Sequence, residues 1–262
     1  MTQTFHVPKP PLNYLPRPDQ LEPLVALLLS DRPEAVGVVD VQGMGGIGKS
    51  VLAAAAAGEK RLHTRFKDGI YWLTIGQSPD MVAIQRQLAR DLGVPLNEIQ
   101  FLDAALGRTE LENRLADKAV LLVLDDVWHL EHAEQLDVVR PPGRVLITTR
   151  NQSVLQSLGA AVHPVDLLTP EESLKLLAEW AGQNRQTLPP EAADVARECG
   201  YLPLALAMVG AMIQRRRRHS RPRRAAAPRP TAPLPGIPGR RETVGESHPL
   251  PCASTTCKWT TS

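Results

Sequence analysis

Cysteine is scarce in this chain of 262 residues, which contains only Cys199, Cys252 and Cys257. Three cysteines cannot form the paired framework of a disulfide-stapled secreted domain, which favours a reducing compartment. Cys252 and Cys257 have no second pair or histidines at zinc-ligand spacing, so no metal site is predicted there. His129 and His132 also lack a nearby third ligand, and a surface or capping role is predicted for them.

Long apolar runs are missing as well. The longest extends from Leu202 to Ile213 and includes Pro203 and Gly210, whereas a helix that spans a bilayer needs about 20 apolar residues. The N-terminus has no apolar signal core. These absences argue against a membrane protein, and we expect a cytoplasmic one.

Aromatic residues make up only 4% of the chain, and the basic C-terminal segment contains Trp259 alone. Residues 214–262 carry eleven Lys or Arg against two Glu, whereas residues 1–213 carry nineteen against twenty-six. With eight prolines and no apolar periodicity, this segment is predicted to be a disordered tail. Its arginines could bind nucleic acid by counterion release, but the lack of stacking residues favours an incidental charge run.

The most informative motif that is present is Gly-Met-Gly-Gly-Ile-Gly-Lys-Ser at residues 43–50. It follows a β-like run at 36–41 and precedes an alanine-rich, helix-favouring run at 51–57, which is the setting a phosphate-binding loop requires. Backbone N–H groups and the helix N-terminus then form an anion cradle. Lys49 is predicted to reach the β- and γ-phosphates, and Ser50 to ligate Mg²⁺. The predicted nucleotide-binding residues are Gly43, Met44, Gly45, Gly46, Ile47, Gly48, Lys49, Ser50 and Val51.

A second motif, Val-Leu-Leu-Val-Leu-Asp-Asp-Val-Trp, occupies residues 120–128. Its five apolar residues predict a strand buried on both faces of a parallel sheet. Ligands bind outside the carboxyl ends of such strands, so both acids are expected to face the phosphates. Asp125 is predicted to be the second Mg²⁺ ligand, and Asp126 to orient or activate the attacking water.

Strands and helices alternate along the middle of the chain, which predicts an α/β fold of three layers: a parallel five-stranded sheet with helices on both faces. The predicted strands are 36–42, 69–74, 119–125, 144–149 and 161–166. The predicted domains are an N-terminal segment and lead helix (1–32), a P-loop nucleotide-binding domain (33–168), a helical subdomain (169–213) and the tail (214–262).

Two helix starts carry capping signals. Asp19 and Glu22 have the spacing of a capping box, which would open the lead helix with Pro23 in its first turn. Thr169 and Glu172 repeat that spacing at the start of the helical subdomain. A later helix, 203–213, is apolar nearly all round and is expected to be buried against a partner.

Five motifs in order resemble the NB-ARC ATPases, which belong to the STAND class of signal-transduction NTPases. Besides the two motifs above, these are Ile-Thr-Thr-Arg-Asn at 147–151, Leu-Leu-Thr-Pro-Glu-Glu-Ser at 167–173 and Cys-Gly-Tyr-Leu-Pro-Leu-Ala-Leu at 199–206. The resemblance covers roughly residues 14–213. It implies that Thr149 and Arg150 sense the terminal phosphate, that Pro203 packs near the nucleotide, and that Arg17 belongs to a segment beside the adenine.

The resemblance also implies an ADP- or ATP-dependent switch with Mg²⁺ as cofactor and at most slow hydrolysis. The catalytic set would be Lys49, Asp125, Asp126 and Arg150. Because no further family subdomain follows Ile213, we expect a truncated chain that lacks effector or sensor domains and does not assemble in a regulated way. An AAA-type ATPase with substantial turnover and a nucleic-acid-binding regulator that uses the tail remain alternatives; the first typically has Asp-Glu where this chain has Asp125-Asp126.

Overall fold

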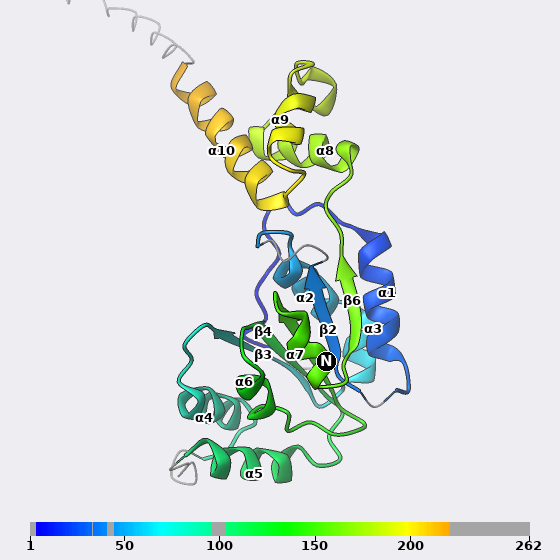
Figure 1. Ribbon diagram of the computed structural model, residues 1–262, viewed down its shortest axis with the longest axis vertical. Coiled ribbons are helices and arrows are strands. Elements are labelled where there is room, and N and C mark those ends of the chain that lie inside the picture. Colours follow the sequence, from blue (N-terminus) through cyan, green and yellow to red (C-terminus); the bar gives the residue numbers. More distant parts are fainter. Residues whose placement is uncertain (1–3, 33, 41–44, 96–102, 221–262) are drawn as a thin grey trace, which may run out of the picture. The chain divides into compact units, whose positions relative to one another are not determined.

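The computed structural model describes residues 4–32, 34–40, 45–95 and 103–220 (Figure 1). Its centre is a parallel sheet in the order β1-β3-β4-β5-β2-β6. The strands are β1 (Thr4–Phe5), β2 (Val36–Asp40), β3 (Gly69–Gly76), β4 (Val120–Val127), β5 (Arg144–Thr149) and β6 (Ala161–Val165). The five predicted strands are confirmed within the described residues, whereas residues 41–42 of the first predicted strand lie outside them. Strand β1 adds a two-residue strand at the edge that the sequence did not predict.

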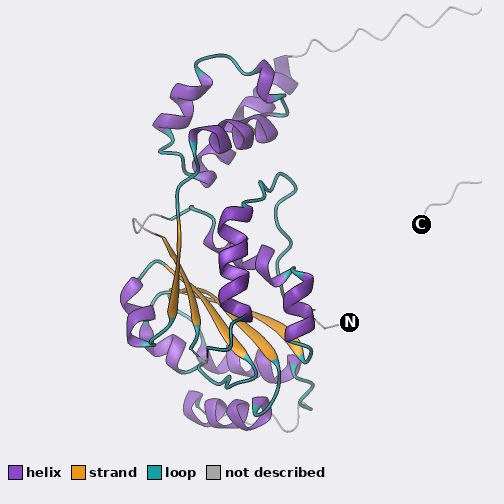
Figure 2. Cartoon of the chain, turned by 90° about the vertical axis from the view of Figure 1, so that its right-hand side faces the viewer, coloured by secondary structure: helices purple, strands orange, loops and turns teal. Residues whose placement is uncertain are grey.

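Helices cover both faces of the sheet, which gives the three predicted layers (Figure 2). One face is covered by α1 (Pro18–Leu29), α2 (Lys49–Ala57) and α3 (Lys60–Arg65). The other is covered by α4 (Met81–Asp91), α5 (Ala104–Leu115), α6 (Leu130–Glu134) and α7 (Gln152–Ser157). Alternate residues of the central strands enter the two cores: Leu121 and Val123 face α2, whereas Leu122 and Leu124 face the opposite helices.

A helical cluster follows the sheet and consists of α8 (Pro170–Ala181), a 3₁₀ turn η1 (Arg185–Thr187), α9 (Ala192–Glu198) and α10 (Pro203–Ser220). The capping box predicted at its start is present, because Glu172 N–H donates to Thr169 Oγ1 and Thr169 N–H donates to Glu172 Oε2. Helix α10 continues to Ser220, so the first residues of the predicted tail are helical; residues 221–262 lie outside the described part. No helix in the described ranges has the length and apolarity needed to cross a bilayer.

The capping box predicted at Asp19 is wrong. Helix α1 begins one residue earlier, at Pro18, and its N-cap, Arg17, makes no side-chain capping bond. The Glu22 carboxylate instead accepts two hydrogen bonds from Arg61, at 2.9 and 2.8 Å. Pro23 therefore lies inside the helix rather than in its first turn.

Helix α10 packs against α8, in line with the expectation that an apolar helix is buried against a partner, but only one of its faces is buried. Leu206 is fully buried, but Leu204, Met208 and Met212 are 57%, 60% and 59% exposed. Gly210 lies where α10 meets α8: a Cβ added there would come within 2.6 Å of Trp180 Cβ and 3.1 Å of the Leu177 carbonyl oxygen.

Gly210→Ala is expected to destabilise the protein even though alanine is the better helix former. The extra methyl group would push backbone against backbone, and overpacking of this kind costs about 1–3 kcal/mol, more than the ~1 kcal/mol gained in helix propensity. Urea unfolding followed by circular dichroism measures the difference. Gly58→Ala is the matched control, because its added Cβ makes only ordinary contacts at 3.4 and 3.7 Å. A Gly210→Ala variant as stable as the wild type would contradict this packing argument.

Candidate functional site

The phosphate loop connects β2 to α2, and its described part is residues 45–50; Gly43 and Met44 lie outside the described residues. Gly46 and Gly48 have φ angles of 89° and 100°, which only glycine adopts without strain. Gly48 is the N-cap of α2, so the unpaired N–H groups of the first helical turn lie at the end of the loop. Lys49, the first helical residue, is only 9% exposed.

The acidic pair lies at the carboxyl end of β4, beside strand β5. The pairing of β4 with β5 shifts register between Leu124 and Val127, and Asp126 has a φ angle of 56°. Both features are typical of a bulge that re-aims side chains at the end of a strand. The two carboxylates consequently line different cavities.

Thr148 holds this corner of the sheet together. Its hydroxyl donates to Asp125 Oδ1 at 2.6 Å and accepts from the Asp126 N–H at 2.9 Å. Asp125 is 8% exposed, and Thr148 is 1% exposed. The Asp125 carboxylate is thus fixed through one oxygen, which leaves the other available for a ligand.

The neighbouring Thr149, predicted to sense phosphate, is not brought to either cavity. It is fully buried, and its hydroxyl donates to the Val127 carbonyl oxygen at 2.7 Å. Side chains alternate along a strand, so only one of the two threonines can face the loop, and that one is Thr148.

Arg150, by contrast, lies against the phosphate loop. A Cβ added to Gly45 would come within 2.7 Å of Arg150 Nη1, so a side chain at this position would push the guanidinium away from the loop. The guanidinium carbon is also 5.2 Å from the centre of the Trp128 ring, a cation–π contact. Arg150 is otherwise exposed and can reach a ligand on the loop.

The larger cavity, about 540 Å³, brings together the loop from Gly46 to Val51 with Asp126, Thr148, Arg150 and Pro203. Sequence reasoning missed its apolar wall. That wall comes from the N-terminal segment, the entry to the helical cluster, α8 and α10: Pro11, Leu15, Leu168, Leu176, Trp180, Leu204, Ala207, Met208 and Ala211.

Helix α10 touches the phosphate loop directly. The Leu204 N–H donates to the Gly46 carbonyl oxygen at 3.2 Å, and a Cβ on Gly46 would come within 2.9 Å of Leu204 Cβ. Pro203, which precedes Leu204, is the first residue of α10 and has no backbone N–H that could donate a hydrogen bond. The helical cluster therefore contacts the residues that are expected to hold phosphate.

Three polar residues of the N-terminal segment and α1 also line the larger cavity. Arg17 donates to the carbonyl oxygens of Asp166 and Leu167, at 3.0 and 3.2 Å, and ties this segment to the entry of the helical cluster. Tyr14 Oη and Gln20 Oε1 are buried and find no hydrogen-bond partner among the described residues. Burial raises the pKa of the Tyr14 phenol, so the group stays a neutral donor. A donor and an acceptor with unused hydrogen-bonding capacity thus lie at the wall of the larger cavity.

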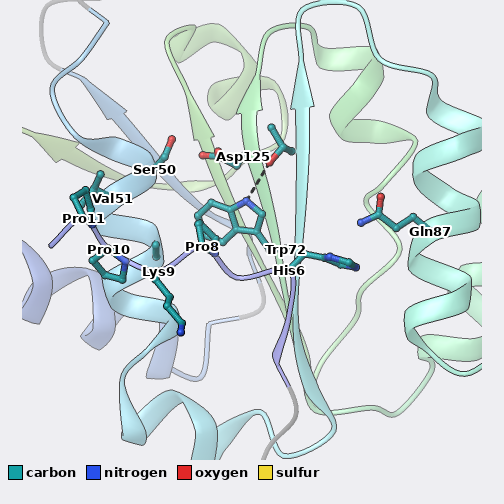
Figure 3. A pocket seen from close by; sticks show the side chains of 12 residues that line it. His6, Pro8, Lys9, Pro10, Pro11, Ser50, Val51, Trp72, Gln87 and Asp125 are labelled. Carbon is teal, nitrogen blue, oxygen red and sulfur yellow. Dashed lines mark hydrogen bonds between the residues drawn. The ribbon is translucent and has the colours of Figure 1, made fainter. Parts of the chain in front are cut away.

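A second cavity, about 520 Å³, contains the two predicted metal ligands, Ser50 and Asp125 (Figure 3). Both offer oxygen, the donor that Mg²⁺ prefers, and Mg²⁺ commonly takes few protein ligands and completes its shell with water and phosphate oxygens. The described ranges hold no cluster of three or more His, Cys, Asp and Glu side chains that could form a closed metal cage. The residues present therefore fit a magnesium ion bound together with a nucleotide.

The fold and this site define a P-loop nucleotide-binding protein. The NB-ARC domain family matches residues 18–187, and the chain belongs to that family. This match favours NB-ARC over the AAA-type alternative that the sequence left open.

Relatives support the same assignment. The chain is 30% identical over 222 residues to apoptotic protease-activating factor 1 of Danio rerio, covering 79% of this chain and 17% of that protein. It is 30% identical over 208 residues to disease resistance protein RPM1 of Arabidopsis thaliana, covering 72% and 22%. The chain thus spans about a fifth of the length of these relatives.

Solved structures share the fold. A STAND protein with a tetratricopeptide repeat sensor from Pyrococcus horikoshii aligns with a TM-score of 0.51 at 22% identity, covering 77% of this chain and 30% of that one. The Aeropyrum pernix ORC2 protein aligns with a TM-score of 0.52 at 16% identity, covering 78% and 63%.

Proposed function

We propose that this chain is an adenine-nucleotide-binding switch module that holds ADP or ATP with Mg²⁺ and hydrolyses ATP slowly or not at all. The observation that carries the proposal is the contact between the phosphate loop and α10, at Gly46 and Leu204. A switch needs an element whose contacts differ between two nucleotide states, and here the helical cluster rests on the loop itself.

The phosphate end of the nucleotide would be held by charge and by aligned N–H groups. The N-terminus of α2 and Lys49 would bind the β- and γ-phosphates, and Arg150, packed against Gly45, would reach a terminal phosphate oxygen. Magnesium would sit between Ser50 and Asp125 and neutralise charge on the phosphates. These groups would position the phosphates and neutralise their negative charge, which is most of what phosphoryl transfer requires from a protein.

The base would occupy the apolar part of the larger cavity. A flat ring buries well against Leu176, Trp180 and Met208, and the free Tyr14 hydroxyl and Gln20 carbonyl could pair with its polar edge. Adenine is favoured by the family membership and by the Aeropyrum pernix ORC2 structure, which is described as ADPNP–ADP complexes.

Slow hydrolysis is part of the proposal because the family resemblance implies a nucleotide-dependent switch rather than a fast ATPase. Asp126, the candidate for orienting water, lines the larger cavity together with Arg150, whereas Asp125 lines the other. Asp126 is thus the carboxylate on the side where a terminal phosphate would bind, and the rate would depend on its approach to an attacking water.

Purification of the full chain tests the proposal. After denaturation, chromatography of the released small molecules is expected to show close to one adenine nucleotide per chain, with ADP in excess if the module is a switch. Steady-state turnover is expected to be slow and independent of protein concentration. A folded protein with no affinity for adenine nucleotides would overturn the proposal, and turnover that rises steeply with concentration would favour an assembling ATPase.

A further inference from the structure

Three neighbouring strands end in a row of polar side chains on the face of the sheet that α2 covers. Thr74 of β3 is paired in register with Asp125 of β4, and Asp125 accepts the hydrogen bond from Thr148 of β5. The residues two positions earlier on these strands, Trp72, Val123 and Leu146, all belong to the core beneath α2, which fixes the face. The row is therefore hydroxyl, carboxylate, hydroxyl.

Thr74 is the exposed member of the row. It is the one exposed position of β3, between buried Leu73 and Ile75. It lines the same cavity as Ser50 and Asp125, the two predicted magnesium ligands.

The hydrogen bonding of Thr74 leaves its proton free. The Trp72 Nε1–H donates to Thr74 Oγ1 at 3.2 Å, the bond drawn as a dashed line in Figure 3. An indole N–H can only donate, so the threonine oxygen is the acceptor and its own O–H points elsewhere. Within the described residues, that O–H donates to no protein atom. Trp72 is 4% exposed, so the ring that orients the hydroxyl is held firmly by the core.

We propose that Thr74 is a further ligand-binding residue of the nucleotide site: its hydroxyl donates to an oxygen that Mg–ATP brings into the cavity, either a magnesium-bound water or a γ-phosphate oxygen. Together with Ser50 and Asp125 it would form the side of the site that faces the metal. Trp72 is then a positioning residue, which fixes the direction of the hydroxyl. This inference rests on the proposed nucleotide-binding function.

Thr74→Val tests the inference, because valine keeps the shape and suits a strand but removes the hydroxyl. Calorimetric titration of the full chain is expected to show about a tenfold loss of affinity for Mg–ATP and little change for ADP in EDTA. Thr74→Ser is expected to restore affinity. Thr109→Val, on the exposed face of α5, is the matched control.

The ligand conditions separate the two acceptors. A loss seen with Mg–ATP but not with ATP in EDTA would assign the hydrogen bond to a magnesium-bound water. A loss with ATP in both conditions would assign it to the γ-phosphate. An equal loss for every ligand, ADP included, would mean that Thr74 only supports the fold and would overturn the inference, as would an unchanged affinity for Mg–ATP.

Lys49→Ala, measured in the same titrations, distinguishes this inference from the proposed function. If Lys49→Ala weakens binding by about 100-fold while Thr74→Val changes nothing, the inference alone fails. If neither variant alters binding, the nucleotide site itself is wrongly placed. Trp72→Phe, which removes the N–H but keeps a ring, is expected to reproduce part of the Thr74→Val loss for Mg–ATP only.

Discussion

Replacing Lys49 with alanine is expected to weaken the binding of both ATP and ADP by about 100-fold, since each hydrogen bond to a charged group contributes about 1.5–3 kcal/mol. Lys49 is buried at the first position of α2, directly after the two left-handed glycines of the loop. It lines the larger cavity at the end of the loop, where phosphate would bind. Calorimetric titration with each nucleotide measures the loss.

Lys67→Ala is the matched control for this variant. Lys67 is exposed in the turn between α3 and β3, so its removal is expected to leave nucleotide affinity unchanged. The two variants change the net charge equally, which separates a local contact from a general electrostatic effect. A Lys49→Ala protein that still binds ATP within threefold of the wild type would refute the assignment of the loop.

The two adjacent aspartates are expected to respond differently to the same substitution. Asp125→Asn should remove most of the enhancement that Mg²⁺ gives to ATP binding, about tenfold or more, because an amide oxygen is a much weaker magnesium ligand than a carboxylate. The Thr148 hydroxyl can still donate to the amide oxygen, so the corner of the sheet should stay intact. Asp126→Asn should keep the magnesium enhancement and reduce only the residual turnover.

Titration with ATP in magnesium and in EDTA, together with a turnover assay, compares the pair. The two substitutions are at neighbouring positions and change charge and side-chain size equally, so each variant is a control for the other. Equal loss of the magnesium effect in both variants would contradict the separation of the acid pair into two cavities. A reversed result, with Asp126 carrying the magnesium effect, would exchange their roles.

Most of the sheet could be predicted from sequence because its central strands are short apolar runs bounded by polar residues, and these leave few alternatives. The phosphate loop could also be predicted from sequence, since its glycines are required by backbone geometry. Strand β1 could not be predicted, because two residues carry no periodic signal and pair with β3 only in the folded chain.

The resemblance and the strand geometry point to different threonines. The resemblance assigns the phosphate contact to Thr149, whereas strand alternation puts Thr148 on the same face as Leu146, and Thr148 is the threonine that lines the larger cavity. The prediction of a capping box at Asp19 was wrong because Glu22 pairs with Arg61, 39 residues away. The spacing of neighbouring residues carries no information about a partner so distant in sequence. The apolar wall of the larger cavity could not be predicted either, because which face of α10 is buried depends on its packing against α8 at Gly210.

Nucleotide occupancy and the stability of α10 are linked through the hydrogen bond from Leu204 to Gly46. Any free energy by which a ligand favours this conformation of the loop also favours the docked first turn of α10, since coupling between two sites is reciprocal. Hydrogen exchange of the α8 and α10 amides should therefore slow as the site fills, in proportion to ligand affinity. The stability of the helical cluster would then depend on whether nucleotide occupies the loop, and the Leu204–Gly46 hydrogen bond would couple the two.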